Sequence, residues 1–75
     1  MPRFYFDCCG TRHYLLDGVG TEFASLAEAR VHALRVARFV MRMGRPEEDW
    51  YDWAVEVTDE GGDAALRVPF SAAAH

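Results

Sequence analysis

The chain has 75 residues, of which 51% are hydrophobic and 13% aromatic, and its 12 acidic residues outnumber its eight arginines to give a formal net charge of −4. This content of apolar and aromatic side chains excludes a disordered polypeptide, and no apolar run approaches the roughly 18 residues that a membrane span requires. A chain of this size buries only about 60% of its unfolded surface, so we expect a single domain, residues 1–70, with a thin core.

An alternating pattern predicts a hairpin near the N-terminus. Phe4, Phe6 and Cys8 are spaced two residues apart, which is typical of a half-buried strand over residues 3–8. A short turn containing a glycine follows, and residues 12–16 are expected to form the second strand. So brief a connection favours antiparallel pairing.

The next segment predicts a turn and then a long helix. Residues 17–20 contain an aspartate that can bond nearby amides and two glycines that can take positive φ. Ser25 followed by Glu28 is a capping-box pattern, in which the hydroxyl accepts from the Glu28 amide and the carboxylate accepts from the Ser25 amide. Gly44 can supply a left-handed residue after the last turn, and the proline two residues later prevents continuation. We therefore expect a helix over residues 25–43.

This helix is apolar over an unusually wide arc. Its apolar side chains cover about 200°, whereas a helix lying on one sheet needs a stripe only a little over about 100° wide. Leu34 and Met41 extend the stripe on one edge and Phe39 on the other, and Met43 lies near its C-terminal end. We expect these four side chains, together with the aromatic Trp50, to meet a protein partner.

A second hairpin is predicted after the helix. Residues 51–57 alternate strictly between apolar and other side chains, and residues 65–70 repeat the pattern after a turn at residues 59–63. Pro69 cannot donate a ladder hydrogen bond and therefore marks an edge or a strand end. Residues 71–75 have nothing obvious to anchor them, so we expect a frayed tail.

The predicted fold is α+β in the order ββαββ, a four-stranded antiparallel sheet of two hairpins with one long helix packed on one face. The side chains expected to face the core are Phe4, Phe6, Leu15, Leu26, Ala33, Ala37, Val40, Trp53, Val55 and Leu66.

Several short motifs, spread along most of the chain, together resemble a known family. They are Met1-Pro2-Arg3-Phe4-Tyr5-Phe6-Asp7, Asp17-x-x-Gly20-x-x-Phe23, Leu26-x-x-Ala29 and Trp53-x-Val55-x-Val57-x-Asp59-Glu60-x-Gly62. In order and spacing they resemble an uncharacterised family of small proteins from rhizobia and related alphaproteobacteria, a domain of unknown function. The resemblance runs from Met1 to about Phe70. It implies the fold and a bacterial cytoplasmic origin, and it carries over no catalytic residue.

The cysteines and acidic residues do not match a known catalytic or metal site. Cys8 and Cys9 are adjacent, so a disulfide between them would be strained, and no signal peptide is evident at the N-terminus. We expect free thiols and a cytoplasmic protein. Their spacing to His13 fits no standard zinc site, and the acidic residues lack the offsets of a calcium loop. We therefore predict no catalytic residue, no metal and no cofactor.

Charge is distributed unevenly along the chain. Residues 28–45 contain five arginines and one glutamate, whereas residues 46–63 contain eight acidic residues and no base. Arginines spaced along a helix can meet phosphates or carboxylates. The candidate contacts for an acidic partner or a nucleic acid are Arg35, Arg38, Arg42 and Arg45. A solvated or self-complementary face is the simpler interpretation, because the net acidity weakens attraction to nucleic acid.

These observations favour a non-enzymatic protein-interaction or regulatory module. We expect the partner to be a second copy of the chain, forming a homodimer, or another protein, and we expect no membrane partner. The alternative is a small nucleic-acid-binding protein that uses the arginine face of the helix.

Overall fold

The computed structural model describes residues 1–44 and 48–73. Within these ranges the chain forms one long helix, a short 3-10 helix and an antiparallel sheet of five strands. In chain order the elements are β1 (Arg3–Cys9), β2 (Tyr14–Leu15), β3 (Thr21–Glu22), α1 (Leu26–Met43), β4 (Ala54–Thr58), β5 (Ala64–Pro69) and η1 (Phe70–Ala73).

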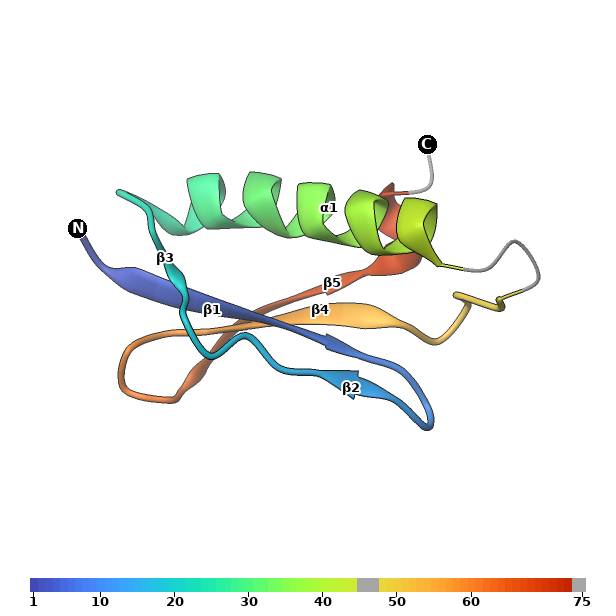
Figure 1. The fold of residues 1–75 in the computed structure, drawn as a ribbon. Helices are drawn as coiled ribbons and strands as arrows, with labels where there is room; N and C mark the ends of the chain where they lie inside the picture. Colours follow the sequence, from blue (N-terminus) through green and yellow to red (C-terminus); the bar gives the residue numbers. More distant parts are fainter. Residues whose placement is uncertain (45–47, 74–75) are drawn as a thin grey trace.

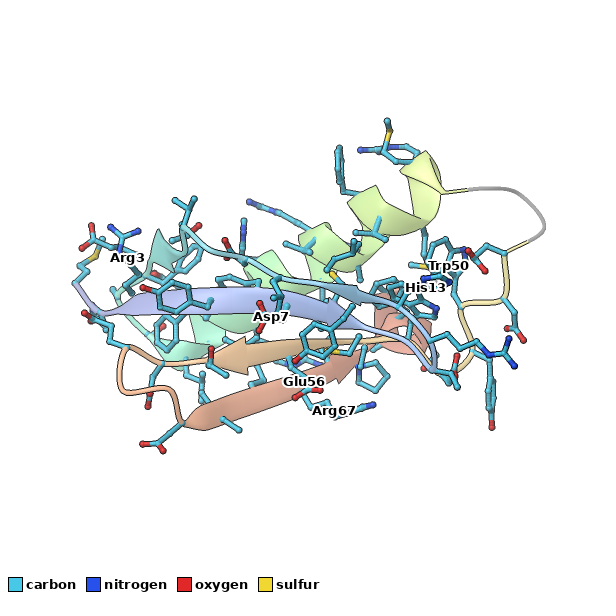
Figure 2. The ribbon with its side chains drawn as sticks, turned by 60° about the horizontal axis from the view of Figure 1, so that its bottom comes forward. Arg3, Asp7, His13, Trp50, Glu56 and Arg67 are labelled. Atoms are coloured by element: carbon cyan, nitrogen blue, oxygen red, sulfur yellow. The ribbon has the colours of Figure 1, made fainter. Side chains whose placement is uncertain are left out.

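The elements form two layers, with α1 lying along one face of the sheet (Figure 1). The strand order is β2-β1-β4-β5, and β3 pairs separately with β1. The register places Phe6 opposite Val57 and Val57 opposite Leu66, and these side chains face the helix. On the other face Asp7, Glu56 and Arg67 point away from α1 (Figure 2). The α+β class, the antiparallel pairing and the single long helix are as predicted.

The sheet has five strands rather than the predicted four, and the order is βββαββ. The additional strand, which was not predicted, is β3. It is only two residues long and pairs with Arg3 and Phe4 at the start of β1. The equally short β2 pairs with Cys8 and Cys9 at its end. β2 lies inside the second strand predicted over residues 12–16, whereas β3 is too short to show an alternation. The turn between them brings the chain back to β1 instead of sending it directly to the helix.

Asp17, in the turn between β2 and β3, lies beside the middle of β1, between these two pairings. Its carboxylate accepts hydrogen bonds from the amides of Phe6, Val19 and Gly20, at 3.1, 3.1 and 3.0 Å. Its own amide donates to Asp7 Oδ1 at 2.8 Å. Gly20 adopts φ 77°, as the predicted turn requires. One side chain thus supplies the acceptor that a continuous neighbouring strand would have offered to β1.

The core is built on three alanines of α1. Ala29, Ala33 and Ala37 are fully buried and let the helix lie close to the sheet. Of the predicted core residues, six are buried and two, Val40 and Leu66, are partly buried against them; the six are Phe4, Phe6, Ala33, Ala37, Trp53 and Val55.

Two predicted core residues are in fact exposed. Leu15 is 51% exposed and Leu26 is 43% exposed. Leu15 lies opposite Cys8, whose side chain is in the core. The prediction that Leu15 faces the helix side of the sheet was therefore correct. β2 nevertheless lies at one edge of the sheet, and Leu15 lines a hollow between β2 and α1 instead of being enclosed. Leu26 is exposed because it is the first residue of the helix.

Both helix ends differ in detail from the prediction. The Ser25 hydroxyl accepts from the Glu28 amide at 3.2 Å as expected, but the Glu28 carboxylate accepts from the amide of Ala24, at 3.1 Å, and not from that of Ser25. Gly44 has φ −79° and is not left-handed. A glycine is needed there for space, because an added Cβ would lie 2.4 Å from the Trp50 ring. Pro46, which was expected to prevent continuation of the helix, lies outside the described residues.

The second hairpin starts later than predicted and the chain ends differently. β4 begins at Ala54, while Tyr51, predicted to face inward, lies in the preceding turn and is 88% exposed. After β5 the chain enters η1, where Phe70 and Ala73 are buried against α1. Residues 71–73 are therefore anchored and not frayed, and the last two residues of the predicted tail lie outside the described part.

Candidate docking surface

Part of the wide apolar arc of α1 remains open to solvent. Phe39 is 54% exposed and Met43 is 69% exposed. The other three predicted contact residues, Leu34, Met41 and Trp50, are partly buried and pack against the core. Of the five predicted contact residues, only Phe39 and Met43 are therefore largely exposed, and both lie on the edge of the helix that faces β2.

An apolar groove of about 390 Å³ runs between this edge of α1 and the strand β2. Its helical wall consists of Phe39, Val40 and Met43, its opposite wall includes Leu15 of β2, and two indole rings also line it. The full lining is His13, Leu15, Phe39, Val40, Met43, Gly44, Glu48, Trp50 and Trp53. We call this the apolar groove. Its members from β2 and the preceding turn were not predicted, because the alternation that correctly put Leu15 on the helix side of the sheet could not show that α1 leaves it uncovered.

The aromatic side chains at this end of the molecule hold the groove in shape. The rings of Trp50 and Trp53 meet edge to face with centroids 5.2 Å apart, and both pack on Phe70. The imidazole of His13 stacks on Trp53 at 6.2 Å and lies beside Trp50 in Figure 2. An added Cβ at Gly10 would lie 2.4 Å from the Trp53 ring, so the turn before β2 fits closely against it.

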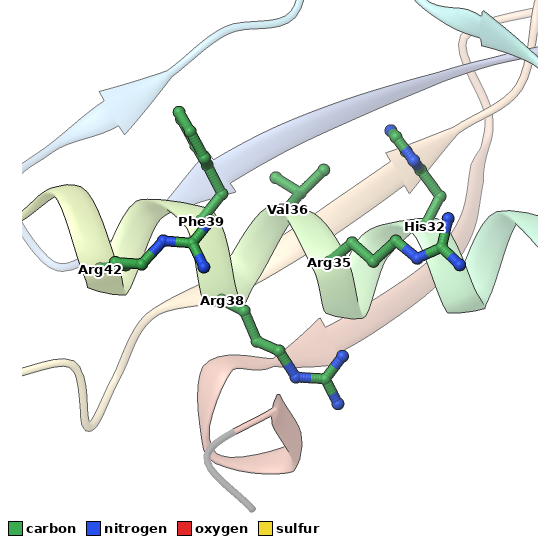
Figure 3. A pocket seen from close by; sticks show the side chains of 6 residues that line it. All are labelled: His32, Arg35, Val36, Arg38, Phe39 and Arg42. Atoms are coloured by element: carbon green, nitrogen blue, oxygen red, sulfur yellow. The ribbon is translucent and has the colours of Figure 1, made fainter.

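A second hollow, of about 500 Å³, lies along the outer side of α1 (Figure 3). Three arginines from successive turns line it, with an imidazole and two apolar side chains; they are Arg35, Arg38, Arg42, His32, Val36 and Phe39. No carboxylate is among these lining residues, so we call it the basic hollow. It contains three of the four predicted arginines, and the fourth, Arg45, lies outside the described residues.

A third, smaller hollow of about 180 Å³ lies beyond the other end of the groove. It contains three carboxylates and one guanidinium, and its lining is Thr11, Arg12, His13, Glu48, Asp49, Asp52 and Trp53. We call it the acidic hollow. The other described acidic residues of this part of the sequence are elsewhere: Glu56 is on the open face of the sheet, and the turn after β4, with Asp59, Glu60 and Asp63, is at the opposite end of the molecule (Figures 1 and 2).

The three hollows adjoin one another. The basic hollow and the apolar groove share Phe39, and the apolar groove and the acidic hollow share His13, Glu48 and Trp53. One side of the molecule therefore carries positive charge, then apolar surface, then negative charge. The sequence indicated the two charged segments, but only the fold brings them to either end of one groove.

The two cysteines are free, as predicted, and both are buried. Burial, followed by the charges of Cys9, Asp7 and Asp17, raises the pKa of Cys8 to about 11. Burial is also the main cause of a raised pKa at Cys9. Both thiols are therefore protonated at neutral pH, which is the unreactive form for nucleophilic attack and for metal binding.

His32 and Asp17 are two further groups whose pKa the fold shifts. Burial and the charge of Arg35 lower the pKa of His32, although the charge of Asp17 partly opposes this. The imidazole ring of His32 lies between the rings of Phe6 and Phe23, with centroid distances of 4.7 and 5.0 Å. Burial alone would raise the pKa of Asp17, but its three amide donors and His32 outweigh this and lower it. At neutral pH the pair is therefore a neutral imidazole and a carboxylate.

Among residues 1–44 and 48–73, no three His, Cys, Asp or Glu side chains lie where they could hold one metal ion. No helix in this described part of the chain has the length and apolar character needed to cross a bilayer.

Comparison with known proteins places the chain in a family without assigning it an activity. No curated protein matches it, and no solved structure does. A family model matches residues 3–71, which is nearly the full length and agrees with the extent of the resemblance noted in the sequence. The predicted alphaproteobacterial range of the family stays a prediction. The chain belongs to the family described as Domain of unknown function (DUF6894).

Proposed function

We propose that this protein is a non-enzymatic protein-interaction module and that it docks its partner, a second copy or another protein, in the apolar groove. The observation that carries the proposal is the exposure of Phe39, Met43 and Leu15 around a groove lined by two indole rings. Large apolar side chains that gather at one place on a small domain are typical of an interaction site, and aromatic pockets supply most of the binding energy in such sites.

The state of the thiols supports a non-enzymatic role. A cysteine nucleophile needs a lowered pKa, whereas burial raises the pKa of both Cys8 and Cys9. Docking in the groove requires only the apolar side chains and the two charged hollows beside it.

Affinity capture from an extract of the source organism tests the proposal. The wild-type chain is compared with a Phe39→Ser, Met43→Ser variant and with a matched control, Val31→Ser, which replaces a helical side chain 50% exposed outside the groove. We expect the same proteins to be retained by the wild type and the control and lost by the groove variant. Equal retention by all three would contradict the proposal.

A second candidate function, nucleic-acid binding, rests on the basic hollow. Its three guanidinium groups lie on successive helical turns without a carboxylate in the lining, an arrangement that suits phosphate contacts. The test is retention of the chain on mixed DNA and RNA as salt rises. Binding that weakens steeply with salt and is lost in Arg38→Gln, Arg42→Gln would support this function, and no retention at low salt would eliminate it.

A further inference from the structure

We propose that the occupant of the apolar groove is a second copy of this chain, bound antiparallel about a twofold axis that passes through the groove. The inference rests on the proposed docking function and adds the identity and the orientation of the partner. The observation behind it is the order of the three hollows, which is basic, apolar and acidic along one side of the molecule.

A surface with this order is complementary to itself. In a twofold dimer the same patch is used by both copies, and rotation about an axis through its centre exchanges its two ends. The basic hollow of one copy then faces the acidic hollow of the other, and the reverse contact forms at the far end. The apolar grooves meet in the middle, where the exposed Phe39 and Met43 of each copy enter the other's groove.

The charges also exclude the competing arrangements. A dimer that paired the helices through the basic hollows would bring together six arginines, because each copy contributes Arg35, Arg38 and Arg42. A parallel arrangement would set basic against basic and acidic against acidic. Like charges facing one another across an interface disfavour association, so the antiparallel arrangement is selected.

The apolar contact supplies affinity and the charged contacts supply orientation. Rim charges mainly change the salt dependence of association and exclude wrong partners, whereas anchors in a desolvated pocket dominate the binding energy. Removing Phe39 and Met43 should therefore weaken the dimer strongly, and salt should weaken it moderately.

The first test is sedimentation of the purified full chain up to high micromolar concentration. We expect a concentration-dependent dimer whose dissociation constant rises as salt goes from about 50 mM to 500 mM. In Phe39→Ser, Met43→Ser we expect the dissociation constant to rise at least about tenfold, while Val31→Ser leaves it unchanged. A chain that stays monomeric at low salt overturns the inference, as does a dimer indifferent to the groove variant.

The pairing of opposite charges, which the antiparallel arrangement requires, is tested by two charge-reversed chains. In one, Arg38→Glu and Arg42→Glu make both ends of the surface acidic; in the other, Glu48→Arg and Asp52→Arg make both ends basic. All four side chains are exposed, so both variants should fold. Each chain alone should sediment as a monomer, and an equimolar mixture should form a heterodimer, because opposite charges then meet at both ends.

The outcomes separate this inference from the function on which it rests. A mixture that associates no better than its components overturns the antiparallel arrangement. If the purified wild type is monomeric but groove-dependent capture from the extract persists, the partner is another protein, and the docking function stands without the homodimer. If capture also fails, both are wrong.

Discussion

Replacing Asp17 by asparagine should destabilise the fold far more than a neutral isosteric change on an edge turn normally does. The carboxylate uses Oδ2 to accept from the Phe6 amide and Oδ1 to accept from the amides of Val19 and Gly20. An asparagine has one oxygen. In either orientation of the asparagine side chain, its NH₂ group, itself a donor, faces at least one backbone N–H donor. At least one backbone N–H group therefore loses its acceptor.

The size of the effect follows from these bonds. A hydrogen bond to a charged group contributes about 1.5–3 kcal/mol, and an amide left without a partner inside a strand adds to the loss. The amides of Val19 and Gly20 belong to a turn where water can replace the acceptor, so the main loss is at Phe6, and we expect about 2–3 kcal/mol in total. A domain of this size has a total stability of about 4–11 kcal/mol, so Asp17→Asn removes a large share of it.

Urea unfolding followed by tryptophan fluorescence measures this loss, since Trp53 is buried and Trp50 partly buried. The melting temperature should fall by about 8–24 °C. The matched control is Asp7→Asn, which keeps an oxygen acceptor for the Asp17 amide and removes a charge directly opposite Glu56. We expect the control to lie within about 0.5 kcal/mol of the wild type.

The same carboxylate gives the prediction a pH dependence. Because the fold lowers the pKa of Asp17, its stabilisation is fully present above the unfolded value of about 3.9 and is lost as pH falls through the lower folded pKa. The difference between wild type and Asp17→Asn should therefore narrow in acid. Two results would refute the role assigned to Asp17. One is an Asp17→Asn variant as stable as Asp7→Asn at neutral pH, and the other is a stability difference between wild type and Asp17→Asn that stays unchanged down to about pH 2.

Three further predictions follow from single contacts. Gly10→Ala should cost about 1–3 kcal/mol in urea unfolding, because the new methyl group meets the indole ring beneath it, whereas Gly18→Ala, with nothing within 4 Å, should be neutral or slightly stabilising. Because the fold lowers the pKa of His32, the stability of the protein should decline as pH falls below about 6.5 towards the folded pKa. His32→Gln should lack this contribution to the pH dependence of stability, and an NMR titration that gives His32 an ordinary pKa would contradict the prediction. At about pH 8 the buried thiols of Cys8 and Cys9 should react with iodoacetamide at least about a hundredfold more slowly in the native protein than in urea, and equal rates would show that they are accessible thiolates.

The sequence predicted the parts of the fold that periodicity and capping control. The alternation of Phe4 and Phe6 and the serine cap at Ser25 correctly indicated β1 and the start of α1. β3 was not predictable in this way, because two residues cannot show a period and their pairing depends on the carboxylate of Asp17 reaching across to β1.

The candidate site shows the same division. Helical spacing indicated that Phe39 and Met43 exceed what one sheet can cover, and the charge pattern indicated the arginines. The sequence could not indicate that Leu15 from β2 would lie across from Phe39 and Met43, because that depends on how far α1 extends over the edge of the sheet. Nor could it show that Leu34 and Met41 would pack against the core.

The exposure of the groove is a consequence of how this core is built. The alanine row of α1, with Ala33 and Ala37 at its centre, lets the backbone of the helix approach the sheet closely, and the molecule is only 16 Å across its shortest axis. A helix held so close covers β1, β4 and β5 but leaves the edge strand β2 beyond its reach. Side chains that rise from both borders of this gap, Phe39 from the helix and Leu15 from the strand, have no third layer to enclose them. The close packing that gives this thin domain its core therefore also leaves an apolar groove at its edge, and a second copy would supply the missing layer.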